Sequence, residues 1–185
     1  MRAPISLPIL ALAAFVACSD PVRDAEVRNL GAEFPNIPTG EYHRAGQPCV
    51  VCHGTSGPSS ARFTVAGTVF AQQGAAVGVD GATVAMTDSA GGQYTTKTNC
   101  VGNFFVRPEQ WDPSFPILVR VFKGNQVKTM QGAIGRERSC GYCHDDATGG
   151  LEPFRSAGHI YLYASGDSVP APSNCPVNPV VGGSR

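Results

Sequence analysis

Two cysteine–histidine pentapeptides are the residues of this chain whose types and spacing best suit chemistry. They are Cys49-Val50-Val51-Cys52-His53 and Cys140-Gly141-Tyr142-Cys143-His144. Residues three and four apart share one face of a helical turn, so the two thiols and the imidazole of each pentapeptide can approach one planar group together. Cys-x-x-Cys-His is the attachment pattern of c-type haem, in which the thiols form thioethers to the porphyrin and the histidine ligates the iron. The sequence therefore predicts two covalently bound c-type haems, with His53 and His144 as proximal ligands.

Two other uses of paired cysteines compete with haem attachment. Structural zinc modules usually bring their second Cys-x-x-Cys pair within about 20 residues of the first, whereas Cys52 and Cys140 lie far apart in this chain. A thioredoxin-like redox pair would belong to a βαβ pattern, which this sequence lacks. Haem attachment is therefore the preferred interpretation, and zinc binding and free redox thiols are the alternatives.

A sixth ligand on each iron would decide whether the haems are closed to exchangeable molecules. The chain has four histidines, and the two outside the pentapeptides, His43 and His159, are the candidates for the distal positions. The alternative for either is an ordinary solvated or hydrogen-bonded side chain. Met130 and Met86 are fallback ligands, although methionine in an apolar strand is more often core filling.

The first 17 residues have the composition of an export signal, with Arg2 followed by an apolar run from Ile9 to Val16. That run is too short to cross a bilayer as a mature helix, so we exclude it from the fold. Phe15-Val16-Ala17-Cys18 resembles a bacterial lipobox, which would make Cys18 the lipidated first residue of a membrane-anchored lipoprotein. Plain secretory cleavage after Ser19 is the alternative. Both routes predict a location on the periplasmic or cell-surface side, and c-type haem implies the same, because it is attached outside the cytoplasm.

Cys100 and Cys175 remain once the other five cysteines have a role. In an oxidising compartment, two spare thiols most simply form one disulfide. Such a bond would close a loop of about 75 residues and contribute about 4 kcal/mol by the chain-entropy relation. The alternative is two unrelated thiols.

Composition limits the class of protein further. The formal net charge is zero and only 15% of residues are charged, so no basic field argues for a nucleic-acid partner. The 22 glycines and 15 prolines favour a β-rich or loop-rich architecture over a helical bundle. A mature chain of about 165 residues suits one domain with a modest core.

Short alternating segments separated by turn residues predict a mainly β fold, an antiparallel sandwich with the haem motifs on flanking loops. The candidate strands are 63–70, 82–87, 93–98, 103–106, 117–123, 126–130 and 159–163. We expect an export signal at 1–17, a flexible tether at 18–40, a first haem-binding segment at 41–60, a β-sandwich body at 61–135, a second haem-binding segment at 136–150, and a final strand with a Pro-rich tail at 151–185.

Three stretches carry a resemblance to a known fold family: Gly67-Thr68-Val69, Gly81-Ala82-Thr83-Val84 and residues 98–104. They resemble the carboxypeptidase regulatory-like, transthyretin-like β-sandwich over roughly residues 63–123. The whole chain resembles small exported bacterial proteins that combine such a sandwich with two c-type haem sites.

The function expected from these features is electron transfer by a dihaem c-type cytochrome outside the cytoplasm. It would exchange single electrons with other redox proteins through transient contacts and would not be an enzyme. One alternative is a haem enzyme, such as a peroxidase or a reductase of small oxyanions, with one open iron position. Another is a β-sandwich binding module in which haem is accessory.

Overall fold

The structure, a computed structural model, describes residues 20–145, 156–172 and 174–178. The predicted export signal and Cys18 lie outside the described residues, as do parts of the second haem-binding segment and of the C-terminal tail. No helix in the described part of the chain is both long enough and apolar enough to cross a bilayer.

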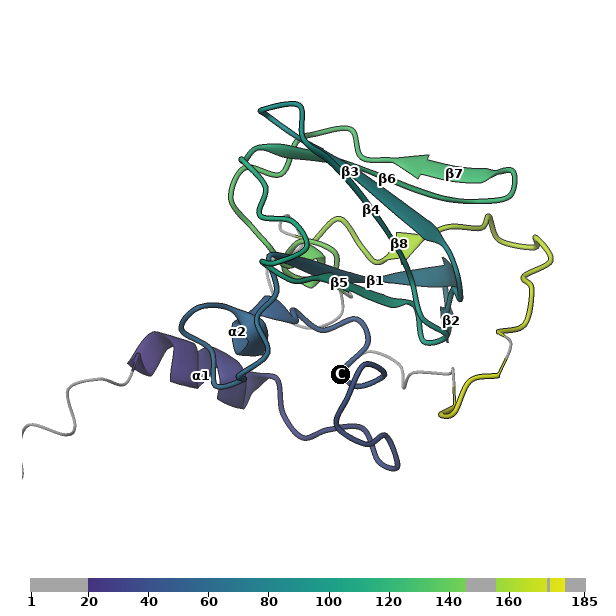
Figure 1. The fold of residues 1–185 in the computed structure, drawn as a ribbon. Coiled ribbons are helices and arrows are strands. Elements are labelled where there is room, and N and C mark those ends of the chain that lie inside the picture. Colours follow the sequence, from purple (N-terminus) through teal and green to yellow (C-terminus); the bar gives the residue numbers. More distant parts are fainter. Residues whose placement is uncertain (1–19, 146–155, 173, 179–185) are drawn as a thin grey trace, which may run out of the picture.

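Within the described residues, eight strands form two four-stranded sheets (Figure 1). The strands are β1 Val65–Gln72, β2 Ala75–Gly78, β3 Thr83–Asp88, β4 Gln93–Lys97, β5 Asn103–Val106, β6 Ile117–Lys123, β7 Gln126–Thr129 and β8 Ile160–Tyr161. One sheet has the order β2-β1-β5 with β8 also paired to β1, and the other has the order β4-β3-β6-β7. The prediction of a mainly β chain with two antiparallel sheets is confirmed, except that β8 runs parallel to β1.

The core between the sheets follows from the alternation of side chains along each strand. On β3, Val84 and Met86 are buried, and across the antiparallel register they lie opposite Val121 and Val119 of β6. Successive side chains of a strand point to opposite faces, so these four fall on the inner face together. Val65 and Val69 of β1 belong to the same buried cluster. Their burial fixes the strand register, since a slip by one residue would expose them.

Strand β1 is buried on both faces, and seven of its eight residues are buried. Its inner face packs in the core, and residues such as Phe70 on its other face belong to a second buried cluster with Ala45 and Val101. In Figure 1, the N-terminal helices lie beneath the β1–β5 sheet, on the side away from the second sheet. The chain before the sandwich is therefore a third layer of the fold.

Part of the segment expected to be a flexible tether, 18–40, is helical. Helix α1, Pro21–Asn29, begins at Asp20, whose carboxylate accepts hydrogen bonds from the main-chain N–H groups of Val22 and Arg23 at 3.1 Å. An aspartate at the N-cap followed by proline is a strong start for a helix. Beyond α1, the guanidinium of Arg44 donates to the carbonyls at Leu30 and Gly31 and to the carboxylate of Glu33. These bonds attach the segment to the domain.

Two smaller differences concern the sandwich itself. Strand β2 at Ala75–Gly78 was not among the expected strands, and it pairs with β1 through a turn at Gly74, whose positive φ of 80° suits glycine. Cys100 and Cys175 form a disulfide with a Cα–Cα distance of 5.5 Å, the pairing that the sequence favours. The bond joins the C-terminal tail to the chain between β4 and β5.

Candidate functional site

The first pentapeptide forms a short helix, α2, at Val50–His53, with Cys49 at its N-cap. The helical turn is closed by a hydrogen bond from the His53 N–H to the Cys49 carbonyl at 2.9 Å. Val50 and Val51 are buried and anchor the turn in the domain. Cys49, Cys52 and His53 all border one cavity of about 590 Å³ beside the turn. The spacing of the motif therefore brings its two thiols and its imidazole to one hollow.

The imidazole of His53 is held in a defined orientation. Its Nδ1 lies 3.0 Å from the carbonyl oxygen of Ala61, which assigns the ring proton to Nδ1 as donor and leaves Nε2 with its lone pair. The ring stacks on Phe63 at a centroid distance of 4.2 Å, and Phe63 stacks on Phe105 at 4.7 Å. Burial lowers the pKa of His53 below its ordinary value of 6.5. A neutral, oriented imidazole is the form that ligates metals.

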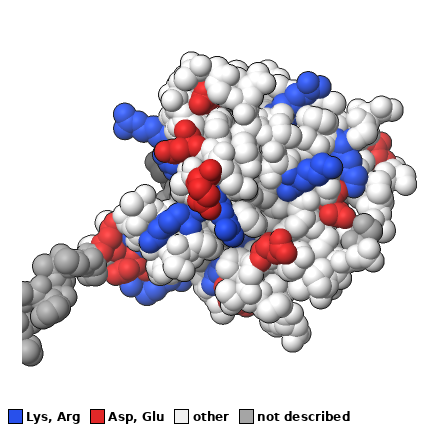
Figure 2. Space-filling view, in the orientation of Figure 1, with Lys and Arg blue, Asp and Glu red and all other residues white. Residues whose placement is uncertain are grey.

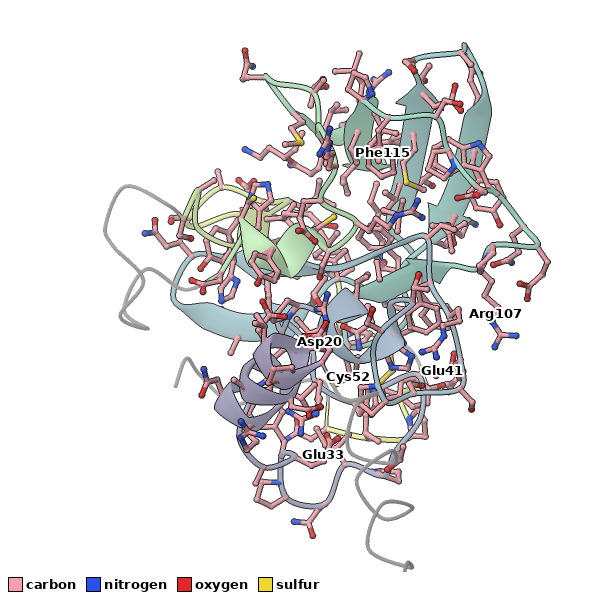
Figure 3. All side chains as sticks on the ribbon, turned by 90° about the vertical axis from the view of Figure 1, so that its left-hand side faces the viewer. Asp20, Glu33, Glu41, Cys52, Arg107 and Phe115 are labelled. Atoms are coloured by element: carbon pink, nitrogen blue, oxygen red, sulfur yellow. A yellow bond between two sulfur atoms is a disulfide. The ribbon has the colours of Figure 1, made fainter. Side chains whose placement is uncertain are left out.

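His43 lies across the same cavity from His53. The two ring centroids are 5.9 Å apart and the planes are inclined by 60°. Two imidazoles bound to opposite sides of one iron, with metal–nitrogen bonds of about 2 Å, have centroids about 6 Å apart. The Nδ1 of His43 is buried without a hydrogen bond among the described residues, and the nearest carboxylate, Glu33, is 3.7 Å away. Figure 3 shows Glu33 and Cys52 on the α1 side of the molecule, far from Phe115.

The second pentapeptide forms a 3-10 turn, η2, at Cys140–Tyr142, closed by a hydrogen bond from the His144 N–H to the Cys140 carbonyl at 2.8 Å. Cys140 is buried against β1, and a β-carbon added to Gly67 would lie 2.7 Å from the β-carbon of Cys140. The residue before the turn, Ser139, forms an isolated bridge with Ala66 of β1. These contacts with β1 fix the position of the second motif.

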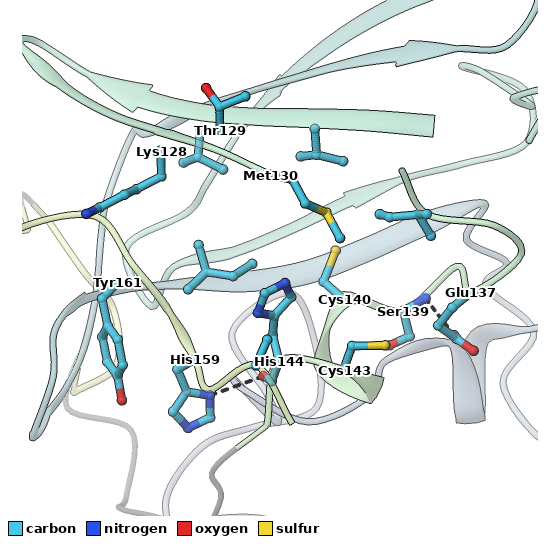
Figure 4. Close-up of a pocket in the computed structure, with 15 residues that line it drawn as sticks. Lys128, Thr129, Met130, Glu137, Ser139, Cys140, Cys143, His144, His159 and Tyr161 are labelled. Atoms are coloured by element: carbon cyan, nitrogen blue, oxygen red, sulfur yellow. Dashed lines mark hydrogen bonds between the residues drawn. The ribbon is translucent and has the colours of Figure 1, made fainter. Parts of the chain in front are cut away.

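The imidazole of His144 repeats the arrangement seen at His53. Its Nδ1 lies 2.9 Å from the carbonyl oxygen of Gly158, so Nδ1 is again the donor and Nε2 keeps its lone pair. His144 borders a second cavity of about 360 Å³, together with both cysteines of its motif and with Met130. In Figure 4, the His144 ring and the Met130 side chain enter this cavity from different walls.

His159, the other expected distal ligand, lies at the rim of the second cavity. Its Nδ1 is 3.3 Å from the main-chain oxygen of His144, and its ring packs on Phe70 at a centroid distance of 4.4 Å. Tyr161, two residues along, also belongs to the Phe70 side, whereas Ile160 packs on the core between the sheets. The structure therefore brings His159 close to the second motif, with its ring toward the outer face of β1.

The two motifs lie next to each other although 86 residues separate Cys140 from His53. A β-carbon on Gly141 would lie 2.9 Å from the Gln47 carbonyl group.

Burial raises the pKa of the Cys49 thiol to about 11 and that of the Cys140 thiol to about 12, and the nearby Cys49 adds to the second shift. These thiols are protonated at neutral pH.

We compared the chain with protein-family models, with curated proteins and with solved structures. None of them matches. The resemblance to the carboxypeptidase regulatory-like sandwich therefore stays a prediction, and only the two-sheet architecture is seen in the structure.

Sequence reasoning missed several groups around the motifs. The carbonyls of Ala61 and Gly158 that orient the imidazoles carry no side-chain signal, because any residue can supply a main-chain acceptor. Phe105 did have a signal: it alternates with the core residue Phe104 on β5 and therefore points to the outer face, where the first motif lies. Glu33 was hidden in the segment expected to be a tether.

Proposed function

We propose that this chain is a dihaem c-type cytochrome that transfers electrons outside the cytoplasm. Cys49 and Cys52 would hold one haem by thioether bonds, and Cys140 and Cys143 the other. His53 and His144 would be the proximal ligands, and the two covalently attached haems supply reversible one-electron chemistry at iron.

The observation that carries this proposal is that the two motif histidines, His53 and His144, make the same kind of hydrogen bond. In each, Nδ1 donates to a main-chain carbonyl, at 3.0 Å for His53 and 2.9 Å for His144. Ligating histidines almost always donate their other ring N–H in this way, which fixes the ring and makes the free nitrogen a better ligand. Each Nε2 is thus left available beside a cavity and beside the two thiols of its own motif.

The alternative of a zinc site receives no support from the arrangement of ligands. Structural zinc needs four protein ligands around one point. Within residues 20–145, 156–172 and 174–178, no three His, Cys, Asp or Glu side chains converge to hold a metal ion. Haem requires less convergence from the protein, because the porphyrin supplies four of the six iron ligands and the chain supplies one or two.

Free redox thiols also fit poorly. Reactive Cys-x-x-Cys pairs have a lowered thiol pKa, because the thiolate is the reacting species. Burial raises the pKa of both Cys49 and Cys140 here, to about 11 and about 12. A raised pKa lowers the thiolate fraction of Cys49 and Cys140 at neutral pH, which is the opposite of what a reactive thiol needs.

The choice of an electron carrier over a haem enzyme rests on His43. An enzyme of the peroxidase or reductase type needs an exchangeable iron position. With centroids 5.9 Å apart, His43 and His53 have the separation of two imidazoles that close one iron from both sides. A closed iron suits electron transfer, and the carrier is therefore the better proposal.

Partners of such a carrier would be other redox proteins that dock transiently. On the face drawn in Figure 2, acidic and basic side chains are mixed and large areas are uncharged. Electrostatic steering by a one-sign field is therefore not expected on this face. Export and a lipid anchor at Cys18 complete the proposal, placing the protein on the periplasmic or cell-surface side of a membrane.

The test is spectroscopy on protein produced with a c-type maturation system. A carrier should show two electrons taken up reversibly per chain, and the haem at the first motif should stay low-spin when cyanide or carbon monoxide is added. The His43→Ala variant should create a high-spin haem that binds those ligands. If wild-type protein binds carbon monoxide at both haems, the enzyme alternative is the better description.

A further inference from the structure

We infer that the sixth ligand of the haem at the second motif is the thioether sulfur of Met130, with His159 serving as a positioning residue. This inference rests on the proposed function and specifies one of its two sites. It also implies that the two haems are chemically different, since the first motif faces the imidazole of His43.

Met130 is placed at the cavity wall by its main chain. Its N–H donates to the Val119 carbonyl of β6 at 3.0 Å, directly after β7 ends at Thr129. The side chain is only partly buried and borders the same cavity as His144. In Figure 4, it extends from the β6–β7 side toward Cys140.

The other methionines do not suit the role. The chain has three; Met1 belongs to the predicted export signal, and Met86 is 1% exposed in the core between the sheets. Met86 also lies opposite Val119 in the β3–β6 register. A core methionine fills space, whereas Met130 ends on a hollow that a haem could occupy.

His159 is engaged elsewhere. Its Nδ1 hydrogen-bonds the main-chain oxygen of His144, its ring lies on Phe70, and its Cε1 is 3.5 Å from the position a β-carbon on Gly46 would take. These contacts turn the ring toward the outer face of β1. The hydrogen bond from His159 to the main-chain oxygen of His144 holds the segment that carries the proximal imidazole.

The lining of the second cavity suits a thioether ligand. Val119, Val121, Ile134 and Ile160 contribute aliphatic walls around Met130. Thioether ligation raises the reduction potential of a haem relative to ligation by two imidazoles, and a water-poor, apolar surrounding acts in the same direction. The second haem should therefore be reduced before the first.

The experiment is far-red absorption and EPR spectroscopy of the oxidised, two-haem protein. Wild-type protein should show the sulfur-to-iron charge-transfer band of a thioether-ligated ferric haem, with the intensity of one haem per chain. Met130→Leu should abolish the band, make one haem high-spin and shift the higher of the two reduction steps downward. Met86→Leu, a volume-conserving control, should keep the band unchanged. His159→Gln should keep the band, because Met130 remains the ligand, but should change the reduction potential of that haem, because the contact with the His144 main-chain oxygen is altered.

Several results would overturn the inference. One is wild-type protein with two low-spin haems and no charge-transfer band, a measurement that requires no variant to fold. Another is a high-spin haem in His159→Gln together with an unchanged spectrum in Met130→Leu. In both cases the dihaem proposal stands and only the ligand assignment fails. A protein without covalent haem would overturn the dihaem proposal itself and this inference with it.

Discussion

Gly67 is the residue whose replacement most directly links the fold to the second motif. It lies on β1 opposite Phe104 of β5, and a β-carbon there would be 2.7 Å from the Cys140 β-carbon and 3.0 Å from both the Cys140 sulfur and a ring carbon of Phe104. Contacts below 3.0 Å force atoms to move. Cys140 and Phe104 are both buried, so neither has free space to move into. The Gly67→Ala variant should therefore displace Cys140 from its place against β1.

The size of the effect follows from two opposing contributions. Overpacking a core position by one methyl group costs about 1–3 kcal/mol. Alanine also lowers the entropy of the unfolded chain relative to glycine, which returns about 0.4–1 kcal/mol. The net loss should be about 1–2 kcal/mol, which for a domain of this size lowers Tm by about 2–8 °C. The proportion of chains that carry a second haem should fall as well, because one attachment thiol has moved.

Thermal unfolding and intact-mass measurement on the same preparations would test this. Gly132→Ala is the matched control, because nothing lies within 4 Å of an added β-carbon there and the residue does not have a positive φ. If Gly67→Ala is as stable as this control and carries two haems as often, the close packing of η2 on β1 is wrong.

Further predictions concern stability. Replacing both Cys100 and Cys175 with serine should cost about 4 kcal/mol in denaturant unfolding, since their bond closes a 75-residue separation; unchanged stability would mean that the bond does not form. Thr98→Val should cost about 1–3 kcal/mol in the same assay, because the buried Thr98 hydroxyl donates to one main-chain group and accepts from another; Thr95→Val, at an exposed position of β4, is the comparison. Burial lowers the pKa of His53, so in haem-free chains its neutral form contributes stability above pH 6.5 that is lost as pH falls through the lowered pKa. His53→Gln should lack that acid-side loss; an identical pH profile would contradict it.

The strands were the most predictable part of the fold. β3 and β6 alternate apolar and polar residues, and their observed bounds fall within a residue or so of the expected ones. β1 could be located but its environment could not, because alternation predicts one exposed face, whereas the N-terminal layer covers the face that the core between the sheets leaves open. That layer was missed because α1 has no buried residues, so no apolar stripe marks it; its start signal at Asp20-Pro21 was nevertheless present.

The candidate site was predictable only where chemistry resides in side chains. The pentapeptides fix which thiols and imidazoles act together, and the structure brings each set to one cavity. The orientation of His159 depended on a parallel pairing of β8 with β1 that no local pattern encodes. The nearness of Gln47 to Gly141 likewise results from how the N-terminal layer folds back. Long-range packing, rather than local pattern, decided those contacts.

The central claim is that two haems are covalently bound, one at each pentapeptide. The most direct test is the intact mass of the full chain, purified with its native maturation and denatured before measurement. The proposal predicts the polypeptide plus two haems, falling to one haem when Cys49 and Cys52, or Cys140 and Cys143, are replaced with serine. A mass equal to the bare polypeptide, with colourless protein after acid–acetone extraction, would contradict it.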